Sequence, residues 1–365
     1  MPEKVSGILK MEAAGAGVLL EPTRQRPVAQ VPAAVVREFD LVEGAAITGE
    51  LDEAGTRLAS IITICGLKPG AYRKRTPFED LTAIDPEERF DFGAADSLTL
   101  RLIDLIAPIA KGTRGLIVSP PKAGKTTLLE QVAQGVRALS TSARIIVLLI
   151  DERPEEVTYF RRTVEAEVYA SSGDQSPAEH IALAKLMLAH IRTELECGNE
   201  VVVLVDSLTR LVRAVNRRIP GGGRSSSASR TLSGGLDAAA LELPRQFFGL
   251  ARNVEDGGSV TILATLLVDT GSRLDQVIYE EFKATGNCEI VLSRELAQEQ
   301  LFPALDIRAS GTRKDDRFYS DEDAQRITTL RRALASRSTR ASLSQLMELL
   351  ERYPTNREFL EVITR

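Results

Sequence analysis

Cysteine is scarce in this chain of 365 residues and follows no spacing pattern. The three cysteines, Cys65, Cys197 and Cys288, lie far apart in the sequence, with no CxxC pair and no Cys/His spacing. Disulfide frameworks and zinc sites both depend on such patterns. The sequence therefore predicts neither, and it favours a reducing compartment such as the cytoplasm.

Long hydrophobic runs and an excess of positive charge are also absent. No apolar run approaches the roughly 20 residues that span a membrane, and the charged start Met1 to Lys4 does not resemble a secretory signal. We expect no contact with a membrane. The formal net charge of -5 gives no overall attraction to nucleic acid, so any such binding must come from a local basic surface.

The residues that are present divide the chain into four regions of different composition and pattern. The content is 43% hydrophobic and 27% charged, which is typical of a globular chain with two or three domains. Residues 1–68 carry short apolar stretches separated by Gly, Pro and charge, a pattern that predicts a small β-rich domain and favours a barrel. Residues 69–97 lack periodicity and are predicted to be a connector. Residues 98–320 form the large domain, and 321–365 a short helical C-terminal cap.

In the large domain, short apolar runs alternate with helical patterns. This alternation predicts an α/β fold, a parallel sheet with helices on both faces. The expected strands are Gly115 to Val118, Ile145 to Ile150, Val201 to Val205, Val260 to Leu267 and Glu289 to Leu292.

A phosphate-binding loop follows the first of these strands. The segment Ser119 to Thr126 reads SPPKAGKT and precedes a helix-like stretch from Leu128 to Val136. Gly124 lets backbone N–H groups turn onto a phosphate, Lys125 can reach the β- and γ-phosphates, and Thr126 can bind Mg²⁺. Ser119 departs from the GxxxxGK[ST] pattern, which has glycine there. We predict that a nucleotide binds at this loop.

Two further strands end in carboxylates, where ligands of such sheets bind. Asp206 ends the run 201–205 and is placed to hold Mg²⁺, although it could instead cap the helix that begins near Ser207. Glu152 follows the run 145–150 and could orient and deprotonate the attacking water. The alternative is that it belongs to a solvated acidic helix start. Among the carboxylates here we favour Glu152.

Two basic loops complete the candidate sites. Arg313 follows a loop that is expected to turn at Gly311. It could enter the site of a neighbouring subunit as an arginine finger, or it could be a surface arginine. The Gly/Ser/Arg segment 220–235 has nothing that packs a core, so we expect a loop. Its N–H groups, hydroxyls and arginines suit a phosphodiester backbone, and its composition equally suits a bare linker.

In this order, the motifs resemble the bacterial transcription terminator Rho family, which are ring-shaped RNA-dependent ATPases with a RecA-like core. The resemblance runs from Gly7 onward and is densest in 115–126, 147–157, 204–211, 232–237, 247–258, 269–287 and 302–314. Rho proteins also carry the PPKAGKT run, with a small residue other than glycine at the position of Ser119.

The resemblance implies a RecA-like P-loop core, a preceding OB-like barrel, and ATP and Mg²⁺ as cofactors. It also implies single-stranded RNA in a central pore and a homo-hexamer. Lys125 and Thr126 would bind phosphate and Mg²⁺, Glu152 would polarise the water, Asp206 would be the Walker B acid and Arg313 the finger. Phe302 would stack on adenine, and Arg153 and Arg210 would couple subunits. The nucleotide contacts would come from Pro121, Lys122, Ala123, Gly124, Lys125, Thr126, Thr127 and Phe302. The pore loops would contribute Arg230, Thr231, Ser233, Gly234, Gly235, Gly271, Ser272 and Arg273.

The barrel departs from the family where Rho proteins stack aromatic side chains on RNA bases. Ala16 and Val18 stand where two phenylalanines are expected, Leu20 replaces a basic residue, and Gln30 and Leu58 fall where tyrosines are expected. Each stack on a base is worth roughly 1 to 3 kcal/mol. The sequence thus resembles a short form of the family whose barrel has lost this site.

Two functions remain open from the sequence. One is an ATP-driven translocase and helicase that holds RNA through its pore loops and terminates transcription. The other is a Rho-like ATPase without termination activity, whose barrel binds a protein such as RNA polymerase and whose core acts as a switch or scaffold. A proton-motor or export ATPase subunit shares the phosphate loop and the strand-end acids, but it does not account for the resemblance over 269–287.

Overall fold

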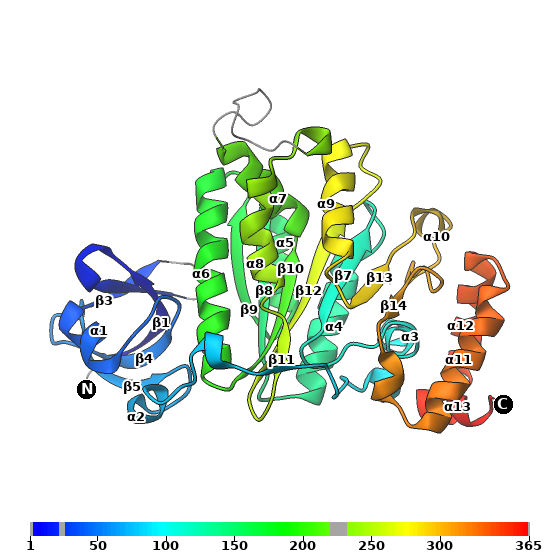
Figure 1. The fold of residues 1–365 in the computed structure, drawn as a ribbon, viewed down its shortest axis with the longest axis horizontal. Coiled ribbons are helices and arrows are strands. Elements are labelled where there is room, and N and C mark those ends of the chain that lie inside the picture. Colours follow the sequence, from blue (N-terminus) through cyan, green and yellow to red (C-terminus); the bar gives the residue numbers. More distant parts are fainter. Residues whose placement is uncertain (1–2, 22–25, 220–231, 364–365) are drawn as a thin grey trace.

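The computed structural model describes residues 3–21, 26–219 and 232–363. It has three parts in chain order: a β-sheet domain, a large α/β domain, and a group of C-terminal helices (Figure 1). The predicted α/β fold class is confirmed. The predicted divisions at 68, 97 and 320 stay predictions, and the fifth strand of the first domain ends at Ile64 while the first C-terminal helix begins at Asp321.

The first domain is a five-stranded antiparallel sheet in the order β3-β2-β1-β4-β5. Its strands are β1 (Lys4–Met11), β2 (Gly17–Leu20), β3 (Pro27–Val31), β4 (Ala46–Leu51) and β5 (Leu58–Ile64). Helix α1 (Ala33–Phe39) links β3 to β4. A parallel bridge between Gln30 and Arg57 joins the two outer strands and curls the sheet toward closure. This is the arrangement of a partly open OB-like barrel, and we call this domain the barrel.

The large domain is built on a nine-stranded sheet whose main path runs β14-β13-β7-β12-β10-β8-β9. Its strands are β7 (Arg114–Ser119), β8 (Arg144–Glu152), β9 (Glu167–Ser172), β10 (Glu200–Asp206), β12 (Ser259–Leu267), β13 (Cys288–Val291) and β14 (Gly311–Thr312). The pairings from β13 across to β9 are all parallel. Two short strands, β6 (Ala83–Ile84) and β11 (Arg252–Val254), add antiparallel pairs beside β12. All five predicted strands are present, and β9 is the parallel strand that the pattern did not reveal.

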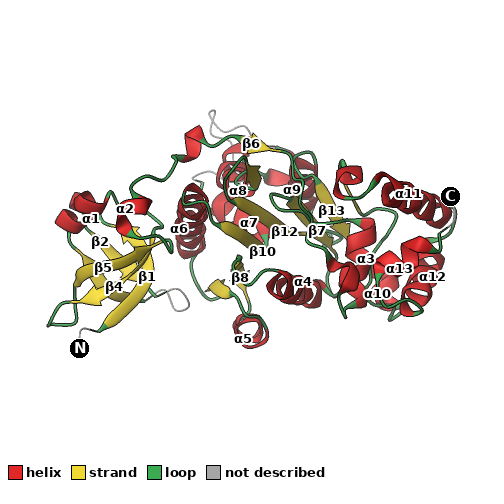
Figure 2. Cartoon of the chain, turned by 90° about the horizontal axis from the view of Figure 1, so that it is seen from below, coloured by secondary structure: helices red, strands yellow, loops and turns green. Residues whose placement is uncertain are grey.

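Helices cover both faces of this sheet (Figure 2). Alternate side chains of each strand point to opposite faces, so Leu116 and Ile117 enter different cores. One face packs against α3 (Leu98–Ile106), α4 (Lys125–Leu139) and α5 (Pro154–Thr163). The other packs against α6 (Pro177–Glu196), α7 (Leu208–Arg218), α8 (Glu242–Phe248) and α9 (Arg273–Lys283).

The C-terminal helices extend the first of these cores. They are α11 (Asp321–Ala335), α12 (Thr339–Glu351) and α13 (Asn356–Glu361), preceded in the chain by α10 (Arg294–Gln298). Ile327, Leu343 and Phe359 join the apolar cluster that contains α3 and α4. The connector between barrel and large domain holds the short helix α2 (Pro69–Tyr72) and β6.

Candidate active site

The phosphate loop stands where the sequence predicts it, between β7 and α4. β7 ends at Ser119, and Gly124 is the N-cap of α4 with φ 90°, a left-handed conformation that favours glycine. Helix α4 begins at Lys125, so its first N–H groups point into the space beyond the strand ends. The loop thus directs backbone N–H groups and a lysine into the same space.

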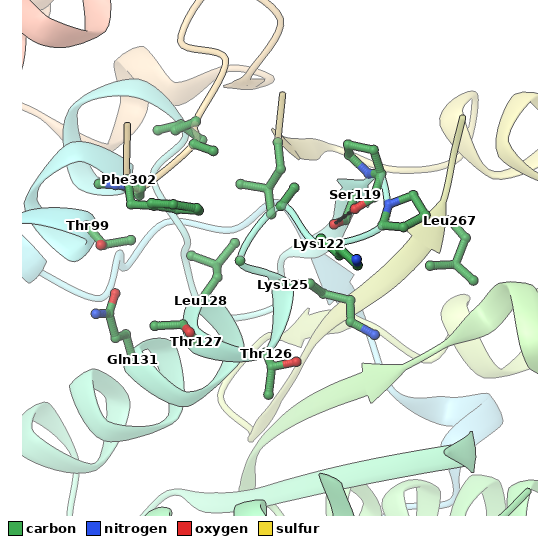
Figure 3. A pocket seen from close by; sticks show the side chains of 18 of the residues that line it. Thr99, Ser119, Lys122, Lys125, Thr126, Thr127, Leu128, Gln131, Leu267 and Phe302 are labelled. Atoms are coloured by element: carbon green, nitrogen blue, oxygen red, sulfur yellow. Dashed lines mark hydrogen bonds between the residues drawn. The ribbon is translucent and has the colours of Figure 1, made fainter. Parts of the chain in front are cut away.

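That space is a cavity of ≈ 1030 Å³. It is lined by every residue predicted to contact the nucleotide, namely Pro121, Lys122, Ala123, Gly124, Lys125, Thr126, Thr127 and Phe302. Phe302 lies on one side of the cavity with Thr99 and Gln131, and the two lysines of the loop lie on the other (Figure 3). The side chain of Phe302 is 45% exposed, which leaves its ring free to stack on a base.

Lys125 faces two carboxylates at the sheet edge. Its Nζ donates to Asp206 Oδ1 at 2.6 Å and lies 3.8 Å from Glu152 Oε2. Asp206 ends β10, is only 2% exposed, and also accepts from Thr265 Oγ1 at 2.8 Å. Because β8 and β10 are parallel neighbours, their terminal carboxylates meet at one edge.

Glu152 lines the cavity and is buried, with 5% of its surface exposed. Its Oε1 accepts from the backbone N–H of Arg153 at 3.0 Å and from Arg210 Nη2 at 3.3 Å. Burial raises the pKa of Glu152 above its ordinary value, and the neighbouring Asp206 adds to the rise, while Arg153, Lys125 and Arg210 oppose it. A buried carboxylate with a raised pKa is suited to accept a proton from water.

The structure brings most, but not all, of the predicted catalytic side chains together. Arg153 and Arg210 line the same cavity as Lys125 and Glu152. Arg313 lies elsewhere, exposed beyond β14 at the outer edge of the sheet, where its N–H donates to Asn287 O at 2.8 Å. Within one chain, Arg313 therefore does not line the nucleotide cavity.

Glu156 is a residue that sequence reasoning did not single out. It lies on the first turn of α5 and lines the cavity, and its Oε2 accepts from Thr126 Oγ1 at 3.3 Å. In the sequence, Glu156 is one of several acidic residues at a helix start, and this pattern does not predict its contact with Thr126. The contact forms because α5 and the phosphate loop become neighbours in the folded chain.

The predicted pore loops lie side by side where the structure describes them. Ser233, Gly234 and Gly235 form a short 3-10 turn, and a Cβ placed on Gly234 would come within 3.0 Å of the backbone of Arg273. Ser272 is the N-cap of α9 and Gly271 precedes it with φ 77°. Arg230 and Thr231 lie outside the described residues.

Both loops are tied down at their bases. Asn216 of α7 donates to Gly235 O at 3.2 Å and accepts from Asp237 N at 2.9 Å. Arg213 forms an ion pair with Asp275, which also accepts from Thr270 Oγ1. These contacts fix residues 232–237 and the second loop, which carries Arg273, at neighbouring places on the large domain.

Comparison with known proteins places this arrangement in a family. Residues 99–312 match the nucleotide-binding domain of the ATP synthase alpha/beta family. The transcription termination factor Rho of Streptomyces coelicolor is 45% identical over 98% of this chain and 85% of its own length. The chain belongs to the transcription termination factor Rho family. A second Rho family relative, from Bacillus subtilis, is 41% identical over 100% of this chain and 84% of its own.

The Rho family assignment and the nucleotide-binding domain make this chain an ATP hydrolase. Solved structures agree on the fold. A prototypical ATPase from the type III secretion system of pathogenic bacteria superposes with a TM-score of 0.62 at 21% identity, covering 77% of this chain and 86% of that one. Over the described ranges 3–21, 26–219 and 232–363, no helix combines the length and apolarity needed to cross a bilayer.

Proposed function

We propose that this Rho-family chain couples ATP hydrolysis in the cavity at Lys125 to translocation along single-stranded RNA, within a ring of identical subunits in the cytoplasm, and that it terminates transcription. The observation that carries the proposal is the convergence of Lys125, Glu152 and Asp206 at the carboxyl ends of the parallel strands. Arg313 lies away from them, next to β14, the outermost strand of the sheet. An arginine that serves a neighbour's site is expected at such an edge.

The residues present suit Mg²⁺ bound together with a nucleotide. The Thr126 hydroxyl and the Asp206 carboxylate are oxygen donors of the kind that Mg²⁺ prefers. Among the described residues, no group of three or more His, Cys, Asp or Glu side chains converges to hold a metal alone. Phosphate oxygens and water would complete the coordination, and the ion would neutralise charge on the phosphates.

The chain's own side chains then have separate tasks. Lys125 exchanges its bond with Asp206 for the nucleotide phosphates, which frees that carboxylate for the metal side of the site. Glu152 orients the attacking water and accepts its proton. Arg210 and Arg153, beside Glu152, transmit the state of the site to the neighbouring subunit. Phe302 stacks on the base.

ATP turnover measured with and without single-stranded RNA tests this proposal. We expect RNA to raise turnover several-fold, and Lys125→Ala to abolish it with and without RNA. Lys283→Ala is the matched control, because Lys283 lies over the Tyr279 ring outside the cavity. Turnover that is the same with and without RNA would overturn the RNA-coupled function while leaving the ATPase intact.

A second function is favoured by the surface of the barrel. Lys10, Val18 and Gln30 are direct neighbours across β1, β2 and β3, so this row presents no aromatic ring. Ala16 is small and half-buried, and Leu58 is 2% exposed within the barrel core. A barrel that presents no aromatic ring for stacking on a base is suited to bind a protein instead of RNA. In that case the ATPase core would act as a switch for the bound protein. Binding of RNA polymerase to the full chain without RNA-stimulated turnover would favour this reading.

A further inference from the structure

The barrel packs against α6 of the large domain, and side chains of α6 bond to the backbone of the barrel. His190 Nδ1 lies 2.8 Å from Gly44 O, and Thr193 Oγ1 donates to Glu43 O at 3.4 Å. Gly44 has φ +85°, and a Cβ there would come within 2.3 Å of the His190 backbone. The barrel and α6 therefore meet at a defined position rather than through a loose surface.

Two of the three cysteines meet across this interface. Cys65 follows β5 in the barrel, and Cys197 is the C-cap of α6. Cys65 belongs to the apolar cluster of the barrel, and Cys197 packs against the same cluster. The third cysteine, Cys288, lies in the core of the large domain with its Sγ 3.8 Å from Ala107 O.

Hydrogen bonds hold both cysteines in place from either side. The Cys65 N–H donates to Ala46 O at 2.7 Å, and its carbonyl accepts from Asn199 Nδ2 at 3.0 Å. The Cys197 N–H donates to Thr193 O at 3.1 Å. Because Asn199 follows Cys197 by two residues, the segment that carries one thiol is bonded directly to the backbone of the other.

We propose that Cys65 and Cys197 are a redox-sensitive pair, which a peroxide converts into a disulfide that fastens the barrel to the large domain. Cys197 is half-buried and is the thiol that a peroxide reaches first, whereas Cys65 is 1% exposed. The Cys197 sulfur takes one oxygen from hydrogen peroxide to give a sulfenic acid, and one water leaves. The Cys65 sulfur then displaces the hydroxyl, so that an S–S bond forms, the S–O bond breaks and a second water leaves.

The surroundings of Cys65 disfavour its thiolate form. Contact with Cys197 and burial raise the pKa of Cys65, and the nearby Glu194 adds to the rise, so Cys65 persists as a thiol rather than a reactive thiolate. Tyr72 is fully buried beside the two cysteines. The S–S bond should therefore form slowly at neutral pH, because the attack on Cys197 requires Cys65 to lose its proton.

The disulfide would change how the barrel is attached. The barrel precedes the large domain in the chain, so its single covalent link is the connector, which begins within four residues of Cys65 (65 to 69). The other contacts that the structure describes between the barrel and α6 are hydrogen bonds and packing, which are non-covalent. A bond from Cys65 to Cys197 would close a second link and prevent the barrel from leaving α6.

Peptide mapping of the full chain after treatment with hydrogen peroxide tests the proposal. We expect a single new disulfide that joins the Cys65 and Cys197 peptides, and a fall in free thiols from the three of the sequence to one. Dithiothreitol should restore all three. Cys288→Ser should form the same bond, and Cys197→Ser should form none while keeping its circular dichroism and its ATP turnover.

A second measurement keeps the test decisive if a variant unfolds. After protease cleavage within the connector, the oxidised wild-type chain should keep its barrel fragment attached on a non-reducing gel and release it after reduction. Three results would overturn the proposal: over-oxidation of Cys197 to sulfinic acid without a crosslink, disulfides between chains only, or the same mixture of pairings from the folded and the urea-unfolded chain.

Discussion

Glu152 is the residue on which the chemical step depends most directly. It is buried beside Arg210 and Lys125, and it is held by the backbone N–H of Arg153. Replacing it by Gln keeps the shape and removes the proton acceptor. We expect Glu152→Gln to lower the rate of ATP hydrolysis by about 10² to 10⁴ while ATP binding persists. Glu156→Gln, in the same cavity, is the matched control and should cost less.

The same carboxyl sets the expected pH dependence. Because burial raises the pKa of Glu152, the group takes up its proton at a higher pH than an ordinary glutamate. The protonated form cannot accept a proton from water. Turnover should therefore fall as the pH is lowered, and the fall should begin above the pH at which an exposed glutamate titrates. The Glu152→Gln variant should not show this decrease on the acid side of its pH–rate profile. An acid limb that persists unchanged in Glu152→Gln would assign it to another group.

The sequence predicts those residues of the site whose positions follow from the order of strands and loops along the chain. Lys125 follows β7, and Glu152 and Asp206 end parallel strands, so their meeting at one edge follows from the strand pattern. Glu156 and Thr265 also touch this cluster, yet each depends on which elements become neighbours in space. The order β7-β12-β10-β8 supplies those neighbours, and no local pattern encodes it.

At the scale of elements, a buried amide is one of several polar groups that attach the C-terminal helices to α3. Asn356 at the start of α13 donates to Arg101 O and to Asp104 Oδ2, each at 2.9 Å, and accepts from Arg101 Nε at 3.2 Å. All three residues are buried. The helical pattern predicted these helices, but it could not predict that their attachment to α3 is polar.

Removal of this amide should loosen the cap. Asn356→Ala removes three hydrogen bonds to buried groups, those with Arg101 Nε, Arg101 O and Asp104 Oδ2, while Arg101 keeps its bond to Leu350 O and Asp104 keeps its ion pair with Arg89. We expect this loss to cost about 1 to 3 kcal/mol in the free energy of unfolding. Urea denaturation measures the change, and Arg357→Ala, an exposed neighbour, is the control. We expect the variant to expose α11 to α13 to protease before the large domain is cut. A loss below 0.5 kcal/mol would show that the hydrogen bonds of Asn356 contribute little to the attachment of these helices.

At the scale of the whole molecule, the barrel decides what the ATPase acts upon. Its fold follows the OB-like pattern, while the row of Lys10, Val18 and Gln30 carries no ring on which a base can stack. The wild-type full chain should therefore show no barrel-dependent affinity for oligo-cytidine. The double change Ala16→Phe and Val18→Phe should raise the overall affinity of the full chain for oligo-cytidine by at least tenfold, since each stack is worth roughly 1 to 3 kcal/mol. Fluorescence anisotropy with labelled oligo-cytidine measures it.

The control for this gain is a ring placed elsewhere on the barrel. Ile62 on β5 is already exposed, so Ile62→Phe adds the same apolar surface away from β2. An equal gain from Ile62→Phe would mean that any exposed ring binds the oligonucleotide. No gain from the double variant would mean that the barrel's backbone, and not only its side chains, has moved away from RNA recognition.

The position of Arg313 makes the assembly itself testable. If Arg313 acts in a neighbour's cavity, each complete site needs Lys125 from one subunit and Arg313 from the next, so Lys125→Ala and Arg313→Ala chains should each be inactive alone. In a random equal mixture, about a quarter of the interfaces pair an intact Lys125 with an intact Arg313, because each subunit identity is drawn independently around a closed ring. Turnover should then rise from the background to roughly that share of the wild-type rate. If both residues served the same chain, every chain in the mixture would carry a defect and no turnover would return.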